Sequence, residues 1–211
     1  MDIDLPAILF WAVLVCSVIW IIDQFFFRKA RLEKNDEAED PTLVEYAKSL
    51  FPVLLLVLIL RSFIAEPYQI PSESMVPTLQ VGDFILVNKY AYGLRLPVFG
   101  TKIYDVDDPA PGDVMVFIPP HDSRYFIKRV IGVPGDKIRY EGKSLYINDE
   151  RLEYELVGRV GGTRRFPIRE YSEVINGVKH AIYKDSSFEV TQEWEIPQGK
   201  YLMMGDNRDM S

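Results

Sequence analysis

Apolar residues are concentrated in two long runs near the start of the chain, at residues 3–22 and 50–65. A helix that crosses a bilayer needs about 20 mostly apolar residues, so the two runs predict transmembrane helices at residues 1–22 and 49–65. A cleaved signal peptide is the alternative for the first run. It would need a basic start and a small-residue cleavage site, and the absence of both favours a retained anchor.

The segment between the two runs indicates how the helices are oriented. The first four residues of the chain include no lysine or arginine, whereas this short segment contains Arg28, Lys29, Arg31, Lys34 and Lys48. Short loops that carry an excess of lysine and arginine stay in the cytoplasm. We therefore expect residues 23–48 to form a cytoplasmic loop and the rest of the chain to lie on the outer side.

From residue 66 onward, short runs of β-forming residues alternate with Gly, Pro, Asn and Asp, and no long amphipathic helix is indicated. The clearest predicted strands are residues 84–87, 114–118, 125–131, 138–140, 145–147 and 200–204. Several short strands at close spacing predict an antiparallel, mainly β domain over residues 66–211. Within this domain we interpret about residues 139–197 as a more divergent insertion.

Charge and composition exclude several classes of function. The formal net charge is −7, so no basic surface for nucleic acid is indicated. The single cysteine, Cys16, lies in the first apolar run, which argues against an internal disulfide and a cysteine nucleophile. No metal-binding or phosphate-loop motif is present, so we expect no cofactor and no metal.

Two serines stand close together just after the second apolar run. Ser72 and Ser74 lie between Pro71 and Pro77. Proline fixes its own φ and pushes the preceding residue towards extended geometry, so we expect Ser72 to Ser74 to be rigid, extended backbone with aimed hydroxyl groups. An ordinary surface turn is the alternative for this segment.

A lysine lies in the middle of the predicted strand at residues 125–131. The alternation of a strand places Phe126, Lys128 and Val130 on one face and Arg129 on the other. Desolvation beside apolar side chains lowers the pKa of a lysine, which would allow Lys128 to act as a general base. The alternative is a pair of basic residues at the solvent edge of a strand.

Taken together, residues 71–79, 125–136 and 205–211 resemble the three ordered motifs of bacterial type I signal peptidases, or leader peptidases, of the Gram-negative two-span type. The resemblance implies two transmembrane helices followed by a β fold of the signal-peptidase and LexA kind. It implies a membrane protease with a Ser–Lys dyad that removes signal peptides from preproteins after Ala-x-Ala-like sites. Its implied place is the bacterial inner membrane, in contact with the lipid bilayer, with the catalytic domain in the periplasm.

The resemblance also assigns roles to individual residues. It implies that Ser74 is the nucleophile and Lys128 the general base. The hydroxyl of Ser72 and the backbone N–H of Ser74 would form the oxyanion hole, and Ser211 would orient Lys128. A Ser-His-Asp triad is not suggested, because His121 and the second histidine lie outside all three motifs.

Further positions are implied for structure and for substrate choice. Asp206 and Arg129 would form a structural ion pair. Two shallow apolar pockets for small substrate residues would be lined by Tyr68, Ile70, Met75, Leu79, Ile85, Val116, Phe126 and Ile127. For each of these eight side chains, plain core packing is the alternative.

Two other functions stay open at this point. One is a self-cleaving regulator of the LexA type, against which the two spans and the lack of a helix-turn-helix count. The other is a non-catalytic or truncated membrane-anchored relative in which the serine and lysine are structural. Members of the signal peptidase family that the chain resembles continue beyond the position of Ser211 into closing strands. We therefore expect this chain to be a fragment.

Overall fold

The computed structural model describes residues 5–34, 39–187 and 190–210. The chain divides into two compact units. The first unit comprises Met1–Pro67 and Leu86–Asp107, and the second comprises Tyr68–Ile85 and Asp108–Ser211.

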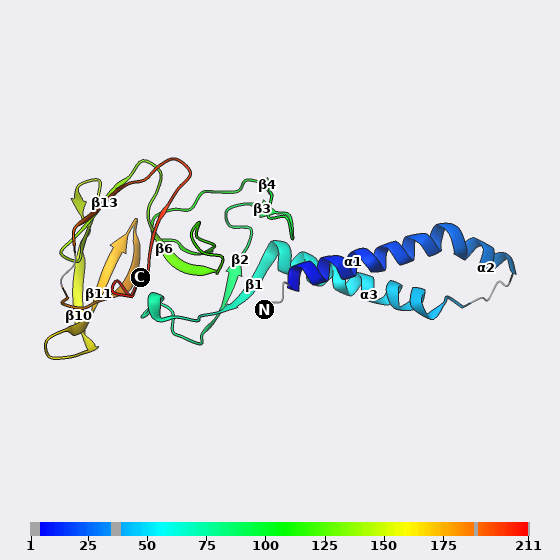
Figure 1. The fold of residues 1–211 in the computed structure, drawn as a ribbon, viewed down its shortest axis with the longest axis horizontal. Helices are drawn as coiled ribbons and strands as arrows, with labels where there is room; N and C mark the ends of the chain where they lie inside the picture. Colours follow the sequence, from blue (N-terminus) through cyan, green and yellow to red (C-terminus); the bar gives the residue numbers. More distant parts are fainter. Residues whose placement is uncertain (1–4, 35–38, 188–189, 211) are drawn as a thin grey trace. The chain divides into compact units, whose positions relative to one another are not determined.

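Two long helical segments that lie side by side make up most of the first unit (Figure 1). The first segment runs through α1 (Leu5–Ile22), a π-helical turn η1 (Asp23–Phe27) and α2 (Arg28–Lys34). The second segment consists of α3 (Thr42–Ile59) and a π-helical turn η2 (Leu60–Ile64). A short hairpin of β3 (Leu94–Arg95) and β4 (Lys102–Tyr104) belongs to the same unit.

Both helical segments are long and apolar enough to cross a membrane, over Leu5–Glu33 and Thr42–Ile64. They extend into residues 23–48, which we expected to be a loop. Residues 28–34 are rich in Arg, Lys, Leu, Ala and Glu, which favour helix, so nothing in this stretch ends the first segment. Residues 35–38, which lie in the expected loop, are outside the described part of the chain.

Three antiparallel sheets build the second unit. The first has the order β14-β6-β5 and consists of β5 (Val114–Phe117), β6 (Phe126–Gly132) and β14 (Leu202–Met204). The second has the order β13-β7-β8-β9 and consists of β7 (Lys137–Glu141), β8 (Ser144–Ile147), β9 (Glu150–Arg151) and β13 (Gln192–Glu195). The third has the order β10-β11-β12 and consists of β10 (Tyr154–Gly162), β11 (Pro167–Ile175) and β12 (Val178–Lys184). In addition, β1 (Ala65–Gln69) pairs with β2 (Phe84–Asn88).

The core of this unit is an apolar cluster to which all three sheets or their connections contribute. Its buried members are Ile131, Ile138, Tyr140, Leu145, Ile175 and Ile196. Burial of large aliphatic side chains is the main favourable term in folding. The cluster therefore holds β6, which carries the lysine, against strands of the insertion.

The fold class predicted from the sequence is confirmed: two apolar helices precede a mainly antiparallel β domain. The six expected strands correspond to β2, β5, β6, β7, β8 and β14, with boundaries that agree within two residues. The strands β10, β11 and β12 were not predicted individually. Bulges next to Gly158 and Gly161 shift the register of β10, which removes the clean alternation that identifies a strand.

Candidate active site

Ser74 lies in a single turn of 3-10 helix, η3 (Glu73–Met75), at the surface of the second unit. Ser72, just before it, has extended backbone at φ −141° and ψ 161°. The expectation of extended backbone was therefore right for Ser72 and wrong for Ser74. The N–H of Val76 donates to the carbonyl of Glu73 at 3.1 Å, and this local bond closes the turn.

The buried side chain of Met75 anchors the turn, and the serine hydroxyl groups lie on its other side, towards the surface. Met75 is buried, with 1% of its surface exposed, and Ser72 is exposed. The two serine Oγ atoms lie 3.3 Å apart, within hydrogen-bond distance. The hydroxyl of Ser72 is therefore a hydrogen-bonding group next to the hydroxyl of Ser74.

Lys128 lies on β6, and η3 packs against this strand. Its side chain is partly buried, and Met115 of β5 is its partner in the register. Burial lowers the pKa of Lys128 below the usual value for lysine, and the carboxylate of Asp206 opposes that shift without cancelling it. In the described part of the chain the hydroxyl of Ser74 contacts Ser72 and makes no hydrogen bond with Lys128. Catalytic contacts of this kind often tighten only when substrate binds.

Arg129, on the opposite face of β6 from Lys128, makes a buried ion pair with Asp206. Its Nε and NH2 donate to the two carboxylate oxygens at 2.8 and 2.7 Å, and its NH1 donates to the carbonyl of Gly112 at 2.7 Å. The hydroxyl of Thr78 donates to the same carboxylate. This network joins the serine segment, β6 and the residues after β14.

Asn207 contacts the backbone of the serine turn directly. Its N–H donates to the carbonyl of Ser74 at 3.1 Å, and its Nδ2 donates to the carbonyl of Glu73 at 3.3 Å. Sequence analysis assigned no role to Asn207. Its position between Asp206 and Arg208 in the third motif was the available indication.

The residues expected to line substrate pockets differ in exposure. Ile70 and Met75 are almost fully buried, so they belong to the core beneath the turn. The other six are partly buried: Tyr68, Leu79, Ile85, Val116, Phe126 and Ile127. Ser211, expected to orient Lys128, lies outside the described residues.

Comparison with known proteins decides the family. The family model described as "Signal peptidase, peptidase S26" matches residues 43–211. The chain is 46% identical to Signal peptidase I of Pseudomonas aeruginosa and 45% identical to that of Pseudomonas fluorescens, in both cases over the whole chain and 81% of the relative. It is also 35% identical to Signal peptidase I of Buchnera aphidicola from Acyrthosiphon pisum, over 90% of the chain and 74% of the relative. The chain belongs to the type I signal peptidase family.

This signal peptidase is therefore a serine endopeptidase, and the two apolar helices make it a membrane-anchored one. The comparisons do not favour a LexA-type regulator or a non-catalytic module. The match over residues 43–211 includes all three motifs that the sequence singled out.

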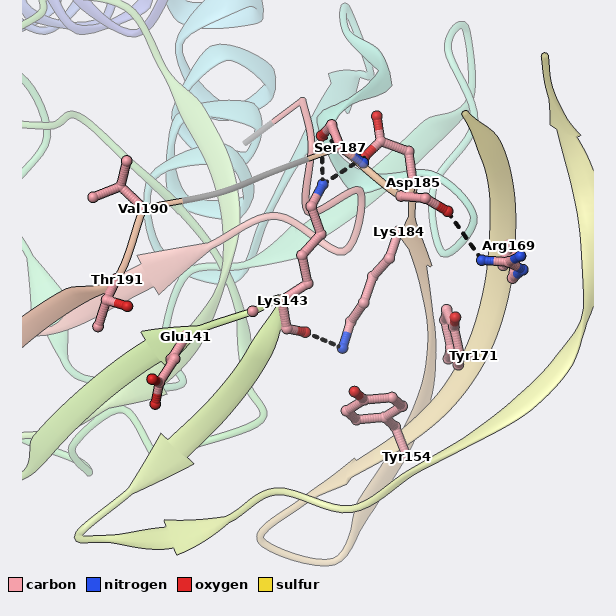
Figure 2. Close-up of a pocket in the computed structure, with 12 residues that line it drawn as sticks. Glu141, Lys143, Tyr154, Arg169, Tyr171, Lys184, Asp185, Ser187, Val190 and Thr191 are labelled. Carbon is pink, nitrogen blue, oxygen red and sulfur yellow. Dashed lines mark hydrogen bonds and ion pairs between the residues drawn. The ribbon is translucent and has the colours of Figure 1, made fainter. Parts of the chain in front are cut away.

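The peptidase also has a large cavity away from the serine and lysine. This cavity of about 890 Å³ lies in the insertion and is lined by Lys143, Tyr154, Tyr171 and Lys184, among other residues (Figure 2). The ammonium of Lys184 donates to the carbonyl of Lys143 at 2.7 Å and lies 3.5 Å from the ring centroid of Tyr154. The cavity includes neither Ser74 nor Lys128, so its size does not identify the catalytic centre.

Proposed function

We propose that this signal peptidase removes signal peptides from exported preproteins, with Ser74 as nucleophile and Lys128 as general base. The observation that carries the proposal is the partly buried Lys128, whose pKa is lowered by desolvation, on the strand against which the Ser74 turn packs. A serine hydroxyl needs a base to accept its proton, and a neutral lysine can accept it.

The proposed reaction has two steps, the acylation of Ser74 and the hydrolysis of the acyl-enzyme. Oγ of Ser74 attacks the substrate carbonyl carbon while Nζ of Lys128 takes the hydroxyl proton. The Ser74 N–H and the Ser72 hydroxyl donate to the resulting oxyanion. The Lys128 ammonium then gives its proton to the leaving amine, which leaves an acyl-enzyme on Ser74. Water attacks this ester while Lys128 again accepts a proton, and Lys128 returns that proton to Oγ of Ser74 as the signal peptide departs as a free acid.

Substrate choice is proposed to depend on two apolar pockets that accept small residues one and three positions before the cut. The partly buried side chains named above supply candidate walls, since their remaining exposed area is apolar. The buried Ile70 and Met75 would then set the depth of the pockets from beneath. Ser211 is proposed to orient Lys128, as the resemblance implies.

We further propose that the peptidase resides in the bacterial inner membrane with its β domain in the periplasm. Basic residues at the end of the first helical segment and the start of the second support this orientation, because they favour a cytoplasmic location for the residues that join the two segments. These basic residues are Arg28, Lys29, Arg31, Lys34 and Lys48. A substrate tethered to the membrane by its own signal peptide would then reach the catalytic domain from the same bilayer.

The test is a set of single and double substitutions assayed with one preprotein in detergent. Ser74→Ala and Lys128→Ala should each abolish cleavage, and the double variant should lose no more than either single variant, because the two groups act as one unit. Lys128→Arg should be nearly as damaging, since a guanidinium stays protonated. The matched controls Ser123→Ala and Lys137→Ala change exposed residues and should retain full activity. Retained cleavage by Ser74→Ala or Lys128→Ala would refute the assignment.

A further inference from the structure

The residues that follow β14 lie between the insertion and the serine turn. The N–H of Tyr183 on β12 donates to the carbonyl of Asp206 at 2.9 Å, and the N–H of Arg208 donates to the carbonyl of Tyr183 at 3.0 Å. Asn207, between Asp206 and Arg208, instead directs its N–H to the carbonyl of Ser74 at 3.1 Å. The short segment of residues 206–208 therefore bonds β12 on one side and the Ser74 turn on the other.

A buried ion pair fixes this segment to the insertion. The guanidinium of Arg208 donates to the carboxylate of Glu173 on β11, and both side chains are fully buried. His180 on β12, the register partner of Glu173, lies with its Nε2 3.2 Å from the same carboxylate oxygen. In the described part of the chain Nε and NH1 of Arg208 have no hydrogen-bond partner. Glu173 is therefore the group that determines the direction of the Arg208 side chain.

Such a pair is better suited to fixing a position than to adding stability. Desolvation of two charges offsets much of their attraction, and buried ion pairs are often no more stabilising than apolar residues of similar volume. Their geometry, however, is narrow, since a buried charge is strongly penalised wherever its partner is not in place. An arginine placed next to Asn207 and held by Glu173 thus restricts where the backbone of Asn207 can lie.

We propose that Glu173 and Arg208 are positioning residues for the cleavage reaction, which hold Asn207 so that it fixes the backbone of Glu73 and Ser74. The inference rests on the proposed role of Ser74 as nucleophile. It gives the β10-β11-β12 sheet a part in catalysis, although none of its residues touches the substrate. A nucleophile misplaced by about 1 Å can lose about 10²-fold in rate, so a shift of this segment has a measurable effect.

The test distinguishes an effect on the cleavage rate from an effect on the stability of the fold. It uses the whole 211-residue chain in detergent and a peptide substrate. Glu173→Gln and Arg208→Lys keep similar volumes but weaken the pair, and Asn207→Ala removes the Nδ2 bond to Glu73. All three should lower kcat, by up to about 10²-fold for the ion-pair variants, with KM and the pH midpoint of the rate unchanged. The control Ile175→Ala destabilises the same core from β11 without touching the segment.

The outcomes are distinct. Melting temperatures are measured for every variant, and rates are compared well below them. If Glu173→Gln, Arg208→Lys and Asn207→Ala all keep the wild-type kcat, or if their losses only match that of an equally destabilised Ile175→Ala, the pair is structural and the inference is wrong. If an ion-pair variant does not fold, Asn207→Ala decides by itself. Ser74→Ala is assayed in parallel. Cleavage by Ser74→Ala would show that Ser74 is not the nucleophile. An inactive Ser74→Ala together with a fully active Glu173→Gln would contradict only the positioning role of Glu173 and Arg208.

Discussion

Lys128 differs from the exposed lysines of the chain in its surroundings rather than in its chemistry. Apolar neighbours desolvate its ammonium, and the one carboxylate that acts on it, Asp206, is already neutralised by Arg129. Two buried opposite charges in contact largely cancel each other's electric field at a third group. The ion pair on one face of β6 therefore allows the lysine on the other face to lose its proton.

The lowered pKa of Lys128 predicts a specific dependence of cleavage on pH. Only neutral Lys128 can accept the proton of Ser74, so kcat/KM should rise with pH through an apparent pKa that is lower than the value of about 10.4 of an exposed lysine. The measurement is kcat/KM for one peptide across the alkaline range. A rate that rises only near the pKa of an exposed lysine would show that Lys128 is solvated.

Ser72 should contribute one of two donors to the oxyanion hole. Its hydroxyl lies 3.3 Å from that of Ser74, and the Ser74 amide remains when the side chain is removed. Ser72→Ala should therefore lower kcat by about 10²–10³-fold, which corresponds to about 2.7–4 kcal/mol, and Ser72→Thr should keep most of the activity. Steady-state kinetics of both variants check this, and a full rate for Ser72→Ala would exclude the side-chain donor.

At the scale of elements, the end of β12 contacts both the segment after β14 and the cavity of the insertion. Tyr183 makes backbone hydrogen bonds with Asp206 and Arg208, and the next residue, Lys184, lies on the wall of the cavity in Figure 2. Burial, with a smaller contribution from the Arg208 guanidinium, lowers the pKa of Lys184 to about 7. The aromatic rings beside it offset part of the desolvation when the ammonium is charged.

This lowered pKa predicts how stability changes with pH. Between about pH 7 and about pH 10 the unfolded chain keeps the proton on Lys184 while the folded chain has lost it. The unfolded state then binds more protons, so the free energy of unfolding should rise with pH, by at most about 1.4 kcal/mol per pH unit from this group. Melting temperatures of the solubilised protein over this range should show the rise. The rise should be smaller in Lys184→Met and unchanged in the control Lys179→Met, which changes an exposed lysine of β12. Equal slopes in the two variants would contradict the prediction.

At the scale of the whole molecule, the orientation of the two candidate spans would determine on which side of the membrane the β domain lies. The single cysteine, Cys16, makes a direct test possible, because Cys16→Ser gives a cysteine-free background. In that background Glu39→Cys lies between the spans and Lys137→Cys lies on β7, and both positions are exposed.

An impermeant maleimide should label Lys137→Cys in cells whose outer membrane is permeabilised, and Glu39→Cys only after the inner membrane is disrupted. The reason is the excess of lysine and arginine near the intervening residues. The gel shift of the labelled chain gives the answer. Labelling of Glu39→Cys before disruption would reverse the proposed orientation.

Local features of the sequence were sufficient for much of the molecule. The apolar runs predicted the helical segments because length and hydropathy alone decide whether a helix can span a bilayer. Strands β5 and β6 were predicted because each is a short run of mostly β-branched, aromatic and other apolar residues, set between segments that contain Gly and Pro. Strands β10 and β11 of the insertion escaped prediction because bulges in β10 and charged residues within β11 obscure the two-residue period.

The candidate site also combines arrangements that the sequence predicted with contacts that it did not predict. Ser72 and Ser74 are near neighbours, and the alternation along β6 separates Lys128 from Arg129, so both arrangements could be derived from the sequence alone. The contacts of Asn207 with the Ser74 turn, and of Arg208 with Glu173, join residues that are far apart along the chain. Only the folded structure decides such contacts, because they depend on how β12 and β14 pack. No local sequence pattern identifies the partner of a buried charge, and the packing of these strands determines where the Ser74 turn is held.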